Sequence, residues 1–255
     1  MISKAKIKYV RSLEQKKYRR LEGAFVAEGP KVVGDLMEVM KPLEVFATSQ
    51  WIEDHAQVLR GTIGSSCIVS EVSDDELRKL SCLQHPQQVL AVFPIPQSST
   101  LPDPDQLILA LDGVQDPGNL GTIIRIADWF GIGTIVCSTD TADAYNPKVV
   151  QATMGSLSRV HIIYRDMTDF IDSLPEGTPV YGTMLDGENI YQKKLEPKGV
   201  IVMGNEGKGI TPEIAKRLSH KLLIPNYPAG RQTADSLNVA IATAITCAEF
   251  RRQQD

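Results

Sequence analysis

The chain lacks the sequence features that mark several large classes of protein. Its cysteines are scattered and form no Cys-x-x-Cys pair, so we expect reduced thiols and no metal site; they are Cys67, Cys82, Cys137 and Cys247. No apolar run approaches the ~20 residues that cross a bilayer. The N-terminal stretch MISKAKIKYVRSLEQ contains no apolar core of signal-peptide length. These absences favour a cytoplasmic protein with no membrane segment.

The familiar phosphate-binding motifs are absent as well, although the chain has 19 glycines. In a P-loop the lysine is followed by a serine or threonine that holds magnesium, but here Lys208 is followed by Gly209. The stretch GIGTIV at 131–136 lacks the third glycine of a dinucleotide-binding fingerprint and leads into a strand pattern. An ordinary nucleoside triphosphatase or dinucleotide enzyme is therefore disfavoured.

Positive charge gathers near the N-terminus, although the net charge of the whole chain is −4. Residues 1–31 contain nine basic and three acidic side chains. Such a segment can bind the phosphates of a nucleic acid. A solvated basic helix is the more common meaning of a charge run taken alone. The candidate nucleic-acid contacts are Lys8, Arg11, Lys16, Lys17, Arg19 and Arg20.

Short apolar runs of strand type alternate with helical patterns along the whole chain. The expected strands are 24–29, 43–48, 66–70 and 88–93 in the first part, and 107–112, 134–138, 160–164, 179–184, 199–204 and 221–225 in the second. The proline-rich stretch PIPQSSTLPDPD at 94–105 is typical of a linker. We therefore expect two α/β domains, at 1–95 and 105–255, joined by a linker at 96–104. Apolar strands that alternate with helices favour a parallel sheet, whose ligands bind at the carboxyl ends of its strands.

A helix is expected within LDGVQDPGNLGTIIRIADWFG, residues 111–131. Asn119 is the expected N-cap of this helix, and Gly131 is its expected C′ residue. Leu120, Ile123, Ile124 and Ala127 have the spacing of a buried face, whereas Gly121, Arg125 and Asp128 share another face. Arg125 then lies beside a glycine, which permits the close approach of a ligand. An ion pair between Arg125 and Asp128 on a solvated helix is the alternative.

Two further segments each follow a strand of the second domain. In GVIVMGNEGKGI at 199–210, the strand ends in a loop with three glycines, which allows its backbone to approach a ligand. In LLIPNYPAGRQTADSLNVAIATAITCAEF at 222–250, a polar link leads to a helix that we expect to start near Asp235 or Ser236. Either side chain could cap that helix, and on their own Ser236 and Asn238 would be assigned only to capping.

Taken together, these segments resemble the SpoU/TrmH-type RNA ribose 2′-O-methyltransferases of the SPOUT class. The resemblance is carried by DPGNLGTIIRIA, VMGNEGKGI and IPNYPAGRQTADSLNVAIA, in this order, and by NPKVVQATMGSLSRV at 146–160. KIKYVRSLEQKKYRRLEGAFVAEGPKVV resembles the start of the substrate-binding domain of many members. The resemblance implies an α/β fold in which a smaller substrate-binding domain precedes a parallel-sheet domain with a deep trefoil knot. It also implies S-adenosylmethionine as cofactor, RNA as substrate and a homodimer.

The resemblance also implies roles for particular residues. Those implied to be catalytic are Arg125, Asn119, Glu206, Ser236 and Asn238, and those implied to bind the cofactor are Thr183, Met184, Gly204, Asn205, Gly207, Ile224 and Leu237. Methyl transfer to a ribose hydroxyl is an in-line displacement that needs alignment and no metal. A guanidinium has a pKa above ~12 and is a poor base at neutral pH. We therefore expect Arg125 to orient the hydroxyl and to stabilise its developing negative charge. Direct acceptance of the proton by Arg125 is the alternative that the resemblance implies.

The sequence departs from the family pattern in the link at 226–235, which is longer and more polar than the usual one. Arg231 and Gln232 in this link contact either RNA or only solvent. Because the well-known tRNA members of that family have shorter N-terminal extensions, the resemblance implies ribosomal RNA rather than transfer RNA as the favoured substrate. One alternative is a ribosome-assembly factor that keeps the fold and binds RNA without turnover. Another is an enzyme that acts on a small nucleotide, for which the basic N-terminal segment is superfluous.

Overall fold

The structure is a computed structural model that describes residues 2–63, 67–96, 102–228 and 231–254, with the side chains of 60–63 excepted. The chain forms two compact units. The first comprises Met1–Gln97 together with Asp143–Ser158, and the second comprises Ser98–Ala142 together with Arg159–Asp255. The predicted linker at 96–104 includes residues 97–101, which lie outside the described residues. Asp143–Ser158 thus groups with the first unit, although the sequence analysis places it in the second domain.

The first unit is built on a sheet with the strand order β1-β4-β2-β3. Its strands are β1 (Ala24–Glu28), β2 (Glu44–Ala47), β3 (Ile68–Glu71) and β4 (Val89–Pro94). Its helical segments are α1 (Lys4–Ser12), α2 (Lys16–Glu22), α3 (Pro30–Val39), α4 (Ser49–Asp54), α5 (Ala56–Ile63), α6 (Asp74–Leu80), α8 (Pro147–Ala152) and η1 (Ser156–Ser158). Strand β4 runs antiparallel to β1 and β2, so this sheet is mixed rather than parallel.

The second unit is built on a parallel sheet with the strand order β10-β8-β9-β5-β6-β7. Its strands are β5 (Leu107–Asp112), β6 (Thr134–Cys137), β7 (His161–Tyr164), β8 (Val180–Asn189), β9 (Gly199–Gly204) and β10 (His220–Leu223). Its helical segments are α7 (Pro117–Trp129), α9 (Met167–Asp172), η2 (Ile190–Gln192), α10 (Pro212–Ala215) and α11 (Val239–Arg252). The prediction of a parallel sheet is confirmed for this unit.

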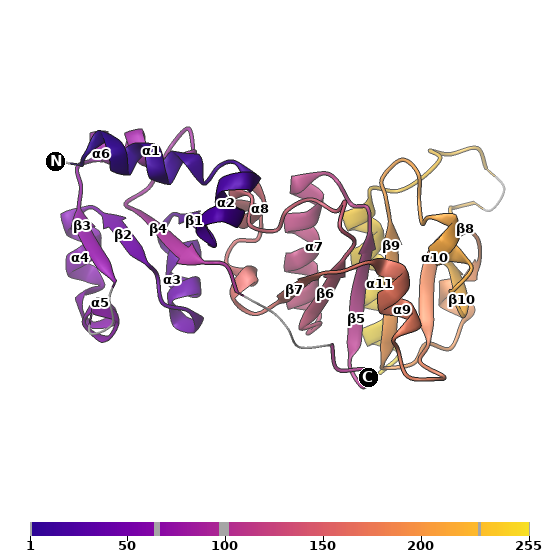
Figure 1. Cartoon of the computed structure of the whole chain (residues 1–255). Coiled ribbons are helices and arrows are strands. Elements are labelled where there is room, and N and C mark those ends of the chain that lie inside the picture. The colour runs from indigo at the N-terminus through magenta and orange to yellow at the C-terminus, as the bar shows by residue number, and fades with distance from the viewer. Residues whose placement is uncertain (1, 64–66, 97–101, 229–230, 255) are drawn as a thin grey trace. The chain divides into compact units, whose positions relative to one another are not determined.

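Helices cover both faces of the parallel sheet, which explains why β5 and β9 are buried along their whole length. On one face, Ile108 of β5 and Val202 of β9 share a core cluster with Phe170 of α9 and Ile214 of α10. On the other face, α7 packs beside α11, which also contacts β9. Figure 1 shows α9 in front of the sheet and the yellow helix α11 behind it. This arrangement leaves the carboxyl ends of the strands open to a ligand.

Helix α7 begins earlier than the sequence analysis predicts. Its N-cap is Asp116, whose side chain accepts a hydrogen bond from the Asn119 backbone amide, and Pro117 occupies the first helical position. The prediction of Asn119 as N-cap is therefore wrong, because proline at this position favours an earlier start. The predicted end is confirmed: Gly131 adopts a left-handed φ of +64°. The amides of Gly131 and Ile132 donate to the carbonyls near the end of the helix, as in a Schellman motif.

Helix α11 begins later than predicted. Its N-cap is Asn238, whose side chain accepts from the amides of Ala240 and Ile241, so neither Asp235 nor Ser236 caps it. Asparagine ranks with aspartate and serine as a cap, and composition alone does not choose between these neighbours. The later start leaves 235–237 outside the helix. No helix in the described part of the chain is long and apolar enough to cross a membrane. The trefoil knot stays a prediction.

Candidate cofactor pocket and active site

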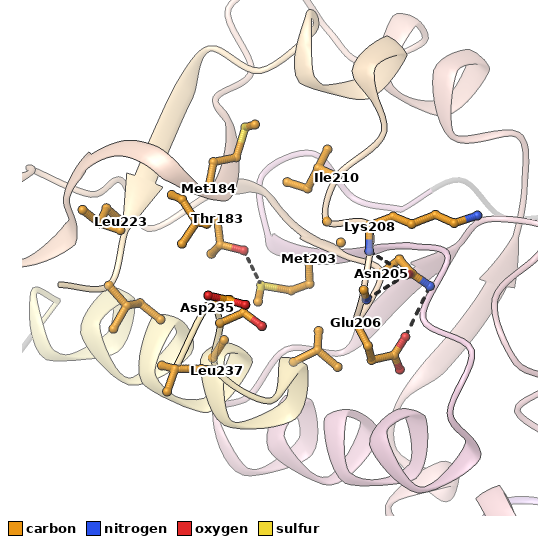
Figure 2. Close-up of a pocket in the computed structure, with 18 of the residues that line it drawn as sticks. Thr183, Met184, Met203, Asn205, Glu206, Lys208, Ile210, Leu223, Asp235 and Leu237 are labelled. Atoms are coloured by element: carbon orange, nitrogen blue, oxygen red, sulfur yellow. Dashed lines mark hydrogen bonds between the residues drawn. The ribbon is translucent and has the colours of Figure 1, made fainter. Parts of the chain in front are cut away.

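A pocket of about 520 Å³ opens beside an irregular stretch within β8 and at the carboxyl ends of β9 and β10, within the second unit. Its wall is formed by 183–186, 203–210, 222–224 and 235–237, together with Val239 and Ala242 at the start of α11. Its volume lies within the range of sites for ligands of drug or cofactor size. Figure 2 shows its apolar side chains, among them Met184, Ile210 and Leu237, around the same space.

One wall of the pocket forms where β8 leaves its neighbour. Gly182 pairs with Lys221, but the next residue of β10, Leu222, pairs with Glu188. Residues 183–187 therefore leave the register between the two strands, and 183–186 line the pocket. The pairing resumes beside Gly187, where an added Cβ would lie only 2.6 Å from the Leu222 carbonyl carbon. The excursion is thus a loop inserted in a strand rather than the end of that strand.

The glycine loop after β9 folds back on itself. The backbones of Asn205 and Gly209 exchange two hydrogen bonds of 3.0 and 2.9 Å, and Asn205 Oδ1 accepts from the amides of Gly207 and Lys208. A Cβ on Gly204 would lie 2.2 Å from the Gly209 carbonyl carbon. Glycine is therefore required at position 204 so that the loop can close on itself, and the closed loop then forms part of the pocket wall.

Glu206 joins this loop to helix α7. Its carboxylate accepts hydrogen bonds from Asn119 Nδ2 at 3.1 Å and from the amides of Gln115 and Asp116 at 3.3 and 3.2 Å. It lies at the N-terminus of α7, where the helix dipole favours negative charge. Partial burial by itself would raise the pKa of Glu206, but the hydrogen bonds from Asn119 and from backbone amides outweigh it, so its pKa is lowered. Glu206 is held as an anion.

Asn119 connects Glu206 to the segment before α11, which is the third of the segments that carry the resemblance. Its Oδ1 accepts a hydrogen bond of 2.9 Å from Asn238 Nδ2, which lies at the start of α11. Glu206, Asn119 and Asn238 come from the three segments that carry the resemblance, and they form one hydrogen-bonded chain. Glu206 and Ser236 also line the pocket. The structure therefore brings four of the residues implied to be catalytic to one place.

Arg125 is not among the residues that line the pocket. It is exposed on α7, and its side chain has no hydrogen bond or ion pair to any residue that the structure describes. The alternative pairing with Asp128 does not form, because Asp128 is bound by Arg159 with N–O distances of 3.0 and 2.9 Å. The Arg125 guanidinium is thus available to a ligand.

The structure places every residue implied to bind the cofactor in the pocket wall: Thr183, Met184, Gly204, Asn205, Gly207, Ile224 and Leu237. Sequence reasoning missed Leu185 and Asp186 in the β8 excursion and Asp235 before α11, which also line it. The excursion depends on pairing with β10 and has no local signal. Asp235 had a signal, the unusual link at 226–235, of which 229–230 lie outside the described residues.

The basic residues near the N-terminus divide into two groups. Lys8, Arg11, Lys16, Lys17 and Arg20 are exposed on or beside α1 and α2. Arg19 is 1% exposed, and its guanidinium donates to the carbonyls of Leu13 and Glu14 and to the carboxylate of Asp143. We therefore withdraw Arg19 from the predicted RNA contacts, because its donors are already used inside the first unit. No cluster of three or more potential metal ligands occurs in the described residues.

Comparison with known proteins identifies the family. Residues 106–248 match the model of the SpoU rRNA methylase family, and residues 4–91 match that of the MRM3-like substrate-binding domain. The chain belongs to the SpoU rRNA methylase family. It is 31% identical to the 23S rRNA (guanosine(2553)-2′-O)-methyltransferase RlmP of Bacillus subtilis, over 96% of both chains.

Solved structures agree with this membership. A putative RNA methyltransferase of the TrmH family from Porphyromonas gingivalis is 40% identical, with a TM-score of 0.87 over 99% of both chains. An AdoMet-bound rRNA methyltransferase from Sinorhizobium meliloti is 33% identical, with a TM-score of 0.88 over 99% of this chain and 96% of that one. The predicted SpoU/TrmH membership, the two-part α/β architecture, the methyltransferase activity and S-adenosylmethionine as cofactor are thereby confirmed.

Proposed function

We propose that this member of the family methylates the ribose 2′-hydroxyl of a nucleotide in 23S rRNA, with S-adenosylmethionine in the 520 Å³ pocket. The observation that carries the proposal is the hydrogen-bonded chain of Glu206, Asn119 and Asn238, which joins the three family motifs at that pocket. Ribosomal RNA rather than transfer RNA is supported by the full-length similarity to the Bacillus subtilis enzyme.

The residues present fit the cofactor and suggest a division of roles. Apolar walls around Met184, Ile210 and Leu237 suit an adenosine moiety, and the loop backbone at 204–209 offers hydrogen-bonding groups beside them. Bound S-adenosylmethionine supplies an electrophilic methyl group on a positively charged sulfur. The ribose hydroxyl needs alignment, and its oxygen needs stabilisation as it gives up its proton to solvent and the C–O bond forms. We assign that stabilisation to the free Arg125 guanidinium and the positioning of the ribose to Glu206, Asn119, Ser236 and Asn238.

We further propose that the exposed basic side chains of α1 and α2 bind RNA phosphates. Lys8, Arg11, Lys16, Lys17 and Arg20 provide the positive charge, and such binding weakens as salt rises. The protein would act in the cytoplasm as a homodimer. Large apolar side chains stand exposed on the two helices that pack together in the second unit, with Trp129 of α7 81% exposed and Ile241 of α11 52% exposed. Such side chains are typical of an interface.

The test of the proposed reaction is transfer of a labelled methyl group. Purified protein is incubated with labelled S-adenosylmethionine and RNA from cells that lack the gene, and the RNA is separated by size and digested to nucleosides. Label in a 2′-O-methyl nucleoside of 23S rRNA supports the proposal. Label in transfer RNA contradicts the proposal that ribosomal RNA is the substrate. Cofactor binding without label in free RNA or in ribosomal particles favours the assembly factor, which binds without turnover.

The role of Arg125 is tested separately. We expect Arg125→Ala to lower the single-turnover methylation rate by about 100-fold or more, as loss of one donor to a developing oxyanion does elsewhere. Its affinity for S-adenosylmethionine should stay within about twofold by titration calorimetry, because Arg125 does not line the pocket. Arg217→Ala is the control, since Arg217 pairs with Asp172 on the same unit. A folded Arg125→Ala variant with full methylation would refute the assignment.

A further inference from the structure

The pocket contains an acidic side chain to which neither the fold nor the family motifs assign a role. Among the described residues, the ionisable side chains that line the pocket are Asp186, Glu206, Lys208 and Asp235. Asp186 accepts a hydrogen bond of 2.6 Å from Lys221 Nζ. Glu206 is held by Asn119 and by backbone amides. Asp235 has no hydrogen bond or ion pair to any described residue.

Lys208 does not compensate the charge of Asp235. Its backbone amide donates to Asn205 Oδ1, and Figure 2 shows its side chain extending away from the pocket. In the same view, Asp235 comes from the side of α11, and its carboxylate points into the pocket toward Thr183 and Met203. Asp235 lines the pocket but is itself exposed, so an opposite charge placed beside it gains only the modest attraction of a solvent-accessible pair. The pocket therefore offers one unsatisfied anion to its ligand.

We infer that Asp235 attracts a positively charged group of the cofactor, either its sulfonium or its ammonium, and thereby strengthens cofactor binding. This inference rests on the proposed function, since it takes S-adenosylmethionine as the ligand. That molecule carries two cationic groups, a sulfonium and an ammonium, and loss of the methyl group leaves a neutral sulfur. A carboxylate near the sulfonium favours the cofactor over the product, whereas one near the ammonium holds both alike. In either case Asp235 acts on binding and not on the methyl transfer itself.

A purely structural role for Asp235 predicts something different. Asp235 precedes Asn238, the N-cap of α11, and an acid near a helix N-terminus stabilises the helix through its dipole. Loss of that effect would lower the melting temperature of the protein without ligand. It would also weaken the binding of every ligand of the pocket to the same extent. A comparison of ligands that carry different cationic groups therefore separates the two roles.

The experiment is titration calorimetry of the full chain and of Asp235→Asn with three probes. S-adenosylmethionine carries the sulfonium and the ammonium, S-adenosylhomocysteine only the ammonium, and 5′-methylthioadenosine neither. We expect Asp235→Asn to bind S-adenosylmethionine about three- to tenfold more weakly and 5′-methylthioadenosine unchanged, with the loss reduced by added salt. Loss for S-adenosylmethionine alone identifies the sulfonium. Equal loss for S-adenosylmethionine and S-adenosylhomocysteine identifies the ammonium.

Controls make the inference refutable. Asp186→Asn removes another acidic side chain of the pocket, which is already paired with Lys221. This change should leave the ratios of the affinities for the three probes unchanged. Asp235→Glu keeps the negative charge and should keep most of the preference for the cationic probes over 5′-methylthioadenosine. Equal weakening of all three probes, no weakening of any, or the same selective loss in Asp186→Asn would overturn the inference. Wild-type protein that binds none of the probes would instead count against the proposed function.

Discussion

At the scale of single residues, Glu206 is the most constrained group of the site. It receives hydrogen bonds from Asn119 and from the amides of Gln115 and Asp116, so it holds the glycine loop against the start of α7. A buried or half-buried carboxylate with several donors is stabilised as an anion. Because these donors converge on its carboxylate, the charge of Glu206 has a structural role before any role toward RNA.

This argument predicts a pH-dependent effect of Glu206→Gln. The pKa of Glu206 is lowered by folding from its ordinary value of 4.5. Its stabilisation is therefore complete above about pH 4.5 and is lost as the pH falls through the lowered pKa. At pH 7 we expect Glu206→Gln to lose about 1–2 kcal/mol of unfolding free energy in urea. At a pH below the lowered pKa of Glu206, the difference from wild type should disappear.

The control for this measurement is Glu213→Gln, since Glu213 is an exposed acid of α10 in the same unit. It should change the unfolding free energy by no more than about 0.5 kcal/mol at either pH. A difference between wild type and Glu206→Gln that is as large below the lowered pKa of Glu206 as at pH 7 would show that shape, and not charge, is what Glu206 contributes.

At the scale of elements, apolar runs and helix starts differ in how far they could be predicted. Most strands were predicted close to their positions, because continuous apolar runs such as LILALD and GVIVMG are typical of the buried strands of a parallel sheet. The exception is β8, which extends to Asn189 although its predicted end is residue 184. The predicted starts of α7 and α11 were wrong, because several residues that could cap a helix lie close together in the sequence. Only the fold determines that Asp116 and Asn238 are the N-caps. The excursion at 183–187 depends on pairing with β10, which no local pattern encodes.

The loop after β9 gives a prediction at this scale. Gly204→Ala places a Cβ about 2.2 Å from the Gly209 carbonyl carbon, so the bridge between Asn205 and Gly209 has to open. Because overpacking of this kind typically costs 1–3 kcal/mol, we expect affinity for S-adenosylmethionine to fall about tenfold or more. Gly133→Ala is the matched control, since nothing lies within 4 Å of its added Cβ. Unchanged affinity in Gly204→Ala would show that the pocket does not depend on loop closure.

At the scale of the whole molecule, the two compact units of the structure differ from the two domains that the sequence predicts. Residues 143–158 lie between β6 and β7 of the second unit, yet they pack within the first. Tyr145 lies against Phe25 of β1 with ring centroids 4.9 Å apart. Removal of 1–95 would therefore strip this segment of its packing partners. A charge change inside the first unit is a cleaner probe of that unit than a truncation.

The buried pair of Arg19 and Asp143 provides that probe. Asp143→Asn leaves the guanidinium of Arg19 buried without its counter-charge, which typically costs 3–5 kcal/mol. Trp51 is buried in the first unit, whereas Trp129 in the second is already exposed, so tryptophan fluorescence in urea reports mainly on the first unit. We expect its transition to move to lower urea by the equivalent of about 3 kcal/mol or more.

Two comparisons make this prediction specific. Asp75→Asn removes one partner of the exposed pair with Arg78 in the same unit and should cost at most about 1 kcal/mol. Affinity for S-adenosylmethionine should stay unchanged in Asp143→Asn, because the pocket is lined only by residues of the second unit. If Asp143→Asn were no more destabilising than Asp75→Asn, the segment 143–158 would be held by its apolar packing, and Arg19 would return to the candidates for RNA contact.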